Sequence, residues 1–174
     1  DIHGFLSGED IVYGDLVFVR GDGEETVFIY PDILTVDYFL ERSLGHPATF
    51  IKRELFHNCL YTESLKIVSD WEFFVKKIIL EGCSYRHVKR TISNFDTSGV
   101  SSLSAKECNR ERELVLKQLF SPVLREYFQE AEQLKKLPLL DVFLRLSKTR
   151  RLQYRIKPLL WFILKTDDFF SGRK

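Results

Sequence analysis

The residues of this chain best suited to acid–base chemistry are two carboxylates in the otherwise apolar run from Ile67 to Phe74. Asp70 and Glu72 stand two positions apart there, directly after Ser69. A carboxylate at a helix start can take a proton from an attacking hydroxyl, and the free amides and the helix dipole favour its ionised form. An Asp in the first helical turn also stabilises a helix without any catalytic role. The pattern predicts a base at Asp70, with helix stabilisation as the alternative.

Glu72 has a simpler interpretation. Ser69 followed three residues later by Glu72 has the form of a capping box, in which each side chain pairs with the other residue's backbone amide. Residues two apart on a helix do not face each other. We therefore do not expect Asp70 and Glu72 to bind a metal as a pair.

Two further polar segments precede this run. One spans residues 10–15 and contains Tyr-Gly-Asp, and the other spans residues 46–53 and reads His-Pro-Ala-Thr-Phe-Ile-Lys-Arg. In this order the three segments resemble the second half of a family 2 glycosyltransferase of the bacterial surface-polysaccharide type, over residues 9–102. The resemblance implies a partial GT-A-like α/β fold of few strands with packed helices. It also implies transfer of a sugar, with inversion, from a nucleotide-sugar donor to a hydroxyl of a saccharide or lipid-linked acceptor, with Asp70 as the catalytic base.

The resemblance assigns substrate-binding roles to five residues. His46 would line the pocket near the donor diphosphate or the acceptor, and Lys52 and Arg53 would contact diphosphate or a charged acceptor. Asp15 would orient the acceptor, and Trp71 would lie beside it while anchoring its helix. The alternatives are a surface histidine at His46, a solvated turn at Lys52 and Arg53, and a structural pairing for Asp15.

The nucleotide-binding half of that family has no counterpart in this chain. The sequence contains no Asp-x-Asp, no P-loop and no GxGxxG. We therefore expect no cofactor and no metal site in this chain, and Mn²⁺ or Mg²⁺ only in the complete enzyme. Apolar surface left by the missing half would favour a homodimer.

The pattern of apolar residues predicts a mixed α/β part at residues 1–103 and a helical region at residues 104–174. Gly14 would mark a bulge or a close approach in the first strand. Gly45 would end a helix in the left-handed conformation, Gly82 would stop the next helix, and His46 before Pro47 would be extended. The predicted strands are 11–19, 26–30, 48–51 and 85–92, the last at a sheet edge, and the predicted helices of the first part are 35–44 and 69–81, with a loop at 93–102.

The helical region has its own signals for where helices begin and break. Ser104 with Glu107 forms a second capping-box pattern, which opens a helix to residue 120. Ser121 before Pro122 begins another helix, Pro138 breaks it, and a last helix covers residues 151–166 with Pro158 inside.

The charge is strongly asymmetric. Residues 135–165 carry nine Lys or Arg against one Asp, a net charge of +8, although the whole chain carries +1. Within residues 148–165, cations come first and a short apolar run with Trp161 follows. This order predicts a helix lying in the interface of an anionic membrane, and packing of the same residues back on the domain is the alternative.

Composition narrows the function classes further. The chain is 44% hydrophobic and 29% charged, which argues against disorder. The three cysteines have no metal-ligand spacing and suggest a reducing compartment, so we expect a cytoplasmic protein, peripheral on the inner face of the plasma membrane. Nucleic acid is not an expected partner, because no stacking platform accompanies the basic residues. The alternative function is a non-catalytic domain that docks a protein or a membrane.

Overall fold

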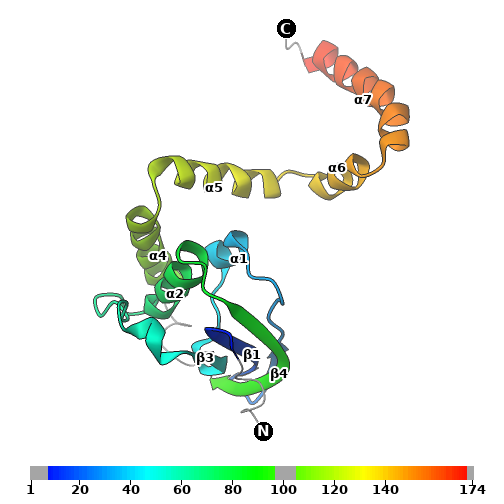
Figure 1. The fold of residues 1–174 in the computed structure, drawn as a ribbon. Helices are drawn as coiled ribbons and strands as arrows, with labels where there is room; N and C mark the ends of the chain where they lie inside the picture. Colours follow the sequence, from blue (N-terminus) through cyan, green and yellow to red (C-terminus); the bar gives the residue numbers. More distant parts are fainter. Residues whose placement is uncertain (1–7, 97–104, 172–174) are drawn as a thin grey trace. The chain divides into compact units, whose positions relative to one another are not determined.

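The structure is a computed structural model that describes residues 8–96 and 105–171, with side chains described as far as residue 166. The chain divides into two compact units, residues 1–120 and 121–174. This boundary differs from the expected one at residue 103, because helix α4 (Ala105–Leu119) contacts the first unit through Glu111 and Arg112. The first unit is mixed α/β, and the second is helical (Figure 1). The remaining elements are β1 (Ile11–Val19), β2 (Glu25–Phe28), α1 (Val36–Glu41), η2 (His46–Ala48), β3 (Thr49–Ile51), η3 (Arg53–Phe56), α2 (Ser69–Phe74), η4 (Val75–Leu80), β4 (Tyr85–Asp96), α5 (Pro122–Lys135), α6 (Leu140–Ser147) and α7 (Arg150–Ser171).

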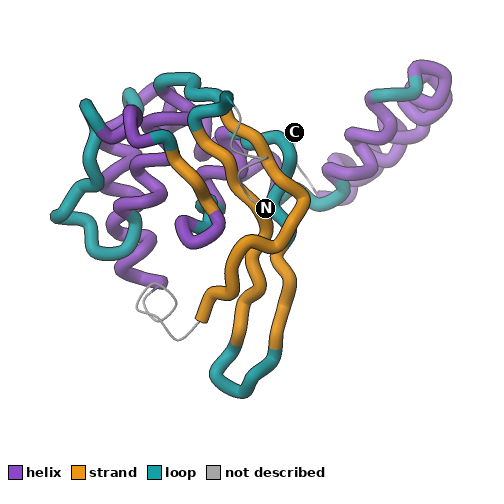
Figure 2. Tube along the Cα trace, turned by 60° about the horizontal axis from the view of Figure 1, so that its bottom comes forward, coloured by secondary structure: helices purple, strands orange, loops and turns teal. Residues whose placement is uncertain are grey.

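The sheet is built around β1, which was predicted with the same bounds. β2 and β3 pair antiparallel with different halves of β1, so both lie along one of its edges. β4 pairs parallel with β1 from Ile11 to Val19 along the other edge. Within the described residues β4 pairs with no other strand, as the prediction of an edge strand required. Figure 2 shows the far ends of β1, β2 and β4 running beyond the helices, where the strand residues are less buried.

Gly14 marks an irregularity in β1, as predicted. The register between β1 and β4 shifts on both sides of Asp15. A Cβ at Gly14 would lie 2.3 Å from Cγ1 of Ile92 and 2.6 Å from the carbonyl oxygen of Arg90. Only glycine allows β4 to approach β1 this closely.

The segment after β2 differs from the prediction in three ways. α1 begins as expected, since Thr35 accepts a hydrogen bond from the Tyr38 amide at 3.1 Å, but it ends at Glu41 because Arg42 is extended. Gly45 is not left-handed, with φ of −73°; it is required because a Cβ there would lie 2.3 Å from Leu16. His46 is not in an extended dipeptide either: η2 is a single 3-10 turn, which the Ala48 amide closes by donating to the Gly45 carbonyl at 2.9 Å.

The helix predicted at residues 69–81 is α2 followed directly by the π-helical segment η4. It stops at Gly82 as predicted, where φ is +70°. Its buried apolar side chains include Trp71, Phe74, Val75 and Ile78. β4 is longer than predicted and runs to Asp96, so residues 93–96 are strand rather than loop. The rest of that loop and the cap at residue 104 lie outside the described residues.

The second unit consists of α5, α6 and α7. Ser121 caps α5 by accepting from the Leu124 amide at 3.4 Å, as predicted. α5 ends before Pro138, and Leu139 then takes the left-handed conformation, with φ of 67°. α7 continues through Pro158. Most of this unit's large apolar side chains are exposed, so its helices bury much less apolar surface than those of the first unit.

Candidate functional site

Asp70, the residue predicted to be a base, lies half-buried in the first turn of α2. Its Oδ1 accepts a hydrogen bond from the Trp71 amide at 2.7 Å. Burial raises the pKa of this carboxyl, and the Trp71 amide and the electrostatic effects of His46 and Arg112 oppose the shift without cancelling it. Burial thus outweighs the free amides and the helix dipole, which were expected to favour the ionised form. A raised pKa makes a carboxylate a stronger base when it is ionised.

His46 acts electrostatically on Asp70 although the two residues stand 24 positions apart in the chain. The short turn η2 carries His46, whose ring packs edge-on against Tyr61 with centroids 5.7 Å apart. Two of the residues that the resemblance assigned to the site therefore lie within range of an electrostatic interaction. Their electrostatic interaction is favourable, because His46 lowers the pKa of Asp70.

Two tyrosines that the sequence analysis did not single out complete this cluster. Burial, followed by the negative charge of Asp70, raises the pKa of Tyr61. Burial also raises the pKa of Tyr30 to about 12, with Asp70 among the smaller causes. The Tyr61 hydroxyl is buried and has no hydrogen-bond partner within the described part of the chain. Both phenols are protonated at neutral pH and can donate a hydrogen bond to an oxygen placed beside Asp70.

Trp71 is a core residue in this structure. Its side chain is 1% exposed, and its indole N–H donates to the Phe39 carbonyl at 2.7 Å. The Arg112 guanidinium of α4 lies over the ring, 5.0 Å from the centroid. Trp71 therefore fixes α2 against α1 and α4, which is the anchoring role expected of it.

The N-terminal end of α2 is held by a carboxylate from α4, and the predicted capping box is wrong. Ser69 makes no cap and instead donates to the Thr62 carbonyl at 3.1 Å. Glu72 accepts from the Thr62 hydroxyl at 2.5 Å and pairs with Lys76 at 2.9 Å. Glu111 instead holds the segment that leads into the helix, through the amides of residues 66–68.

Glu111 is 3% exposed and accepts three hydrogen bonds from consecutive backbone amides. Lys66 and Ile67 donate at 2.9 Å each, and Val68 donates at 3.1 Å. Burial disfavours the ionised carboxylate, but these three amides outweigh that effect and lower the pKa of Glu111. The loop before Asp70 is thereby fixed in place.

Asp15 belongs to a second cluster on the sheet. It accepts from the Tyr30 amide at 2.9 Å, and its Oδ1 lies 2.8 Å from Nε2 of His87. Nδ1 of the same imidazole lies 2.7 Å from Asp32, and the ring stacks on Tyr13 with centroids 5.2 Å apart. Asp15 is thus part of a buried pairing that joins β1 to β4, the alternative stated for it above.

Lys52 and Arg53 are not gathered around Asp70. Lys52 donates to the Gly8 carbonyl at 2.7 Å and pairs with Asp10 at 3.0 Å, which ties β3 to the start of β1. Arg53 is exposed at the first position of η3. Both positions agree with the solvated-turn alternative.

The described residues offer no group of three or more His, Cys, Asp or Glu side chains that could hold a metal ion. Glu72 is turned toward Thr62 and Lys76, so it does not share a ligand set with Asp70. Among the residues that the structure describes, none form a ligand set that fits the Mn²⁺ or Mg²⁺ that the resemblance implies for a complete enzyme. The three cysteines are free thiols.

Sequence reasoning missed Tyr30, Tyr61, Arg112 and Glu111. For Glu111 a signal existed: it stands four residues before the buried Val115, on the stripe that α4 turns toward the core. A charged residue on such a stripe requires partners when it is buried. Tyr30 and Tyr61 carry no comparable signal, because tyrosine is common in cores and at surfaces alike. Comparisons of the chain with protein-family models, with curated proteins and with solved structures find no match.

Proposed function

We propose that this chain is the acceptor-side part of a GT-A-like glycosyltransferase of bacterial surface-polysaccharide synthesis, with Asp70 as the general base. One observation carries the proposal. Asp70 is half-buried with a raised pKa, and His46 from a separate motif of the same resemblance interacts with it electrostatically. The mixed α/β first unit is compatible with such a domain.

In the proposed reaction, Asp70 accepts the proton of an acceptor hydroxyl. The hydroxyl oxygen forms a bond to the anomeric carbon of a nucleotide sugar as the bond to the diphosphate breaks, and the nucleoside diphosphate leaves with that electron pair. Tyr61 and Tyr30 can donate hydrogen bonds to acceptor oxygens. No step is assigned to a metal ion, because the described residues do not supply its ligands.

The test is a glycosyl-transfer assay of the complete gene product with UDP- and GDP-sugars and saccharide acceptors. Asp70→Asn should lower kcat by about 10²–10⁴-fold, the usual contribution of a general base. Asp37→Asn is the matched control, because Asp37 is an exposed acid in the first turn of α1 and should leave kcat unchanged. Glu72→Gln is a poor control, because it would also break the buried pair with Lys76.

The free energy of unfolding of the same variants shows whether Asp70 is a catalytic base or a residue that only stabilises its helix. The pKa of Asp70 is raised in the folded state, so the ionised carboxylate disfavours folding at neutral pH. Asp70→Asn should therefore keep or increase the free energy of unfolding at pH 7 while transfer is lost. Reduced stability with normal transfer would show that Asp70 is a structural residue and would end the proposal.

The donor site is expected outside this chain. Calorimetry of residues 1–174 with UDP- and GDP-sugars and Mn²⁺ should show no dissociation constant below about 1 mM, near −4 kcal/mol. Micromolar, metal-dependent binding would contradict the assignment of this chain to the acceptor side alone.

A further inference from the structure

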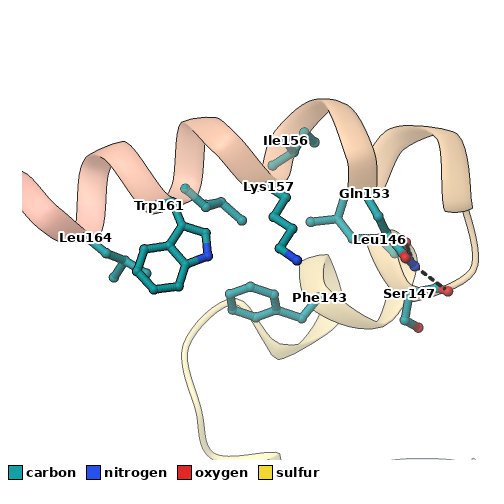
Figure 3. Close-up of a pocket in the computed structure, with 9 residues that line it drawn as sticks. Phe143, Leu146, Ser147, Gln153, Ile156, Lys157, Trp161 and Leu164 are labelled. Carbon is teal, nitrogen blue, oxygen red and sulfur yellow. Dashed lines mark hydrogen bonds between the residues drawn. The ribbon is translucent and has the colours of Figure 1, made fainter.

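The helices α6 and α7 form a hairpin with its own internal contacts. The Gln153 side-chain amide donates to the carbonyls of Leu146 and Ser147 at 2.9 and 2.8 Å, across the turn that joins the two helices. The Thr149 carbonyl accepts from the amides of Leu152 and Gln153. These bonds hold the start of α7 beside the end of α6 (Figure 3).

An apolar groove of about 430 Å³ lies between the two helices. Figure 3 shows Trp161 and Lys157 of α7 and Phe143 of α6 directed into it. Lys157 is the one cation among the residues that line the groove, and Ser147 and Gln153 are its uncharged polar residues. The six apolar lining residues are Phe143, Leu146, Ile156, Leu160, Trp161 and Leu164.

Apolar side chains outside the groove are exposed as well. Leu144 of α6 and three residues of α7 are each more than half exposed, which leaves a large apolar area in contact with water. The three residues of α7 are Leu159, Phe162 and Ile163.

The charge of the hairpin indicates what covers this surface. Residues 139–166 contain seven Lys or Arg and one Asp, so their net charge is 7 − 1 = +6. On a helical wheel the cations of α7 share one side and the aliphatic residues share the opposite side. The cations are Arg150, Arg151, Arg155, Lys157 and Lys165, and the aliphatic residues are Leu152, Ile156, Leu159, Leu160, Ile163 and Leu164.

We propose that α6 and α7 lie together in the interface of an anionic phospholipid bilayer, with the groove between them filled by acyl chains. Cations on one side of α7 and exposed aliphatic residues on the other match the chemistry of anionic headgroups above a hydrocarbon layer, and Trp161 lies on the side of the cations. Within the described residues no helix is long and apolar enough to cross a membrane, so the hairpin lies on the bilayer rather than through it. This inference widens the interfacial segment expected from residues 148–165 to include α6, and it does not depend on the role of Asp70.

The test is co-sedimentation of the full chain with phosphatidylcholine vesicles, with and without 30% phosphatidylglycerol. We expect binding only to the anionic vesicles and loss of binding at high salt. Each cation near an anionic surface strengthens partitioning by about fivefold, so replacing Arg150, Arg151, Arg155 and Lys157 by Gln should weaken binding by about 100-fold or more.

A charge-matched control separates this surface from net charge. Replacing Lys89, Lys106, Arg110 and Lys117 by Gln removes the same four charges from exposed positions of the first unit and should leave binding nearly unchanged. An equal loss in both variants would mean that binding follows overall charge, and it would overturn the proposal.

Tryptophan emission reports on insertion directly. Trp161 is 57% exposed and Trp71 is 1% exposed, so a blue shift with anionic vesicles should come from Trp161 and disappear in Trp161→Phe. If the intact chain does not bind anionic vesicles at low salt, the hairpin is covered by protein and not by lipid, and the proposal fails. A concentration-dependent dimer that shifts Trp161 emission without lipid would identify a second copy as the occupant and would also overturn it.

Discussion

Replacing Glu111 by Ala should destabilise the first unit by about 3–4 kcal/mol, because three backbone amides would lose their acceptor at once. Val68 is buried, and an unpaired buried amide costs about 1–3 kcal/mol. Lys66 and Ile67 are more exposed, so water can replace the carboxylate there, and each of these bonds contributes about 0.5–1.5 kcal/mol. Glu111→Gln should have a smaller effect, because its carbonyl oxygen still accepts while its NH₂ group faces the remaining donor.

The measurement is urea unfolding followed by the fluorescence of Trp71. A Trp161→Phe background removes the other tryptophan, which lies in the second unit, so the signal reports on the first unit alone. Glu113→Ala is the matched control, since Glu113 is exposed on the same helix and its nearest charge contact is Lys117 at 3.5 Å. An exposed pair of this kind contributes at most about 0.5 kcal/mol.

The pH dependence gives an independent check. The pKa of Glu111 is lowered in the folded state, so its stabilisation is complete above its unfolded pKa of 4.5 and is lost as pH falls through the folded value. The stability difference between wild type and Glu111→Ala should therefore narrow below that pH. A loss of stability under 1 kcal/mol in Glu111→Ala at pH 7, or a stability difference that does not change with pH, would refute the conclusion that Glu111 of α4 fixes the start of α2.

Two further substitutions test the sheet. Gly14→Ala should lower the free energy of unfolding by about 2 kcal/mol or more in thermal unfolding, because the new Cβ would overlap Ile92. Gly21→Ala is the control, because a Cβ there meets open space and should change stability by less than about 0.5 kcal/mol. Equal effects of the two substitutions would contradict the close approach of β4 to β1. His87→Leu should cost about 3 kcal/mol in the same assay, because it leaves the Asp15 carboxylate buried without its ring partner, and unchanged stability would mean that the pairing is incidental.

The elements of the fold that follow from local signals were predictable from the sequence. Thr35 and Ser121 are caps that their own helices use, and Gly82 ends η4 with a positive φ. β1 was predictable because it is a nearly continuous apolar run, typical of a strand buried on both faces. In each of these cases the sequence signal lies within a few positions of the structure that it determines.

The predictions that failed depend on partners far along the chain. The capping box at Ser69 does not form, because Ser69 and Glu72 both pair with Thr62 of the preceding loop. That loop is fixed by Glu111, which stands 42 positions after Ser69 and accepts from the amides of residues 66–68. Gly45 was predicted to end a helix, but a glycine is required there because the Leu16 side chain of β1 lies too close for a Cβ. Asp15 and His87 could each be recognised as polar residues in strands, yet their pairing depends on the parallel register of β1 and β4.

The buried carboxylates of the first unit suggest why Asp70 differs from the others. Glu111 is held by three amides, Asp15 by an imidazole and an amide, and Glu72 by a lysine and a hydroxyl. Within the described residues the Asp70 carboxylate has no ion pair within 4 Å, and burial raises its pKa. The fold pairs its other buried acids but leaves the Asp70 carboxylate without an ion pair, at a cost in stability. The neighbouring groups are His46 and the buried Tyr61 hydroxyl, which has no hydrogen-bond partner within the described residues. Groups kept in a destabilising environment of this kind concentrate at functional sites, which is the physical reason to begin the search for activity at Asp70.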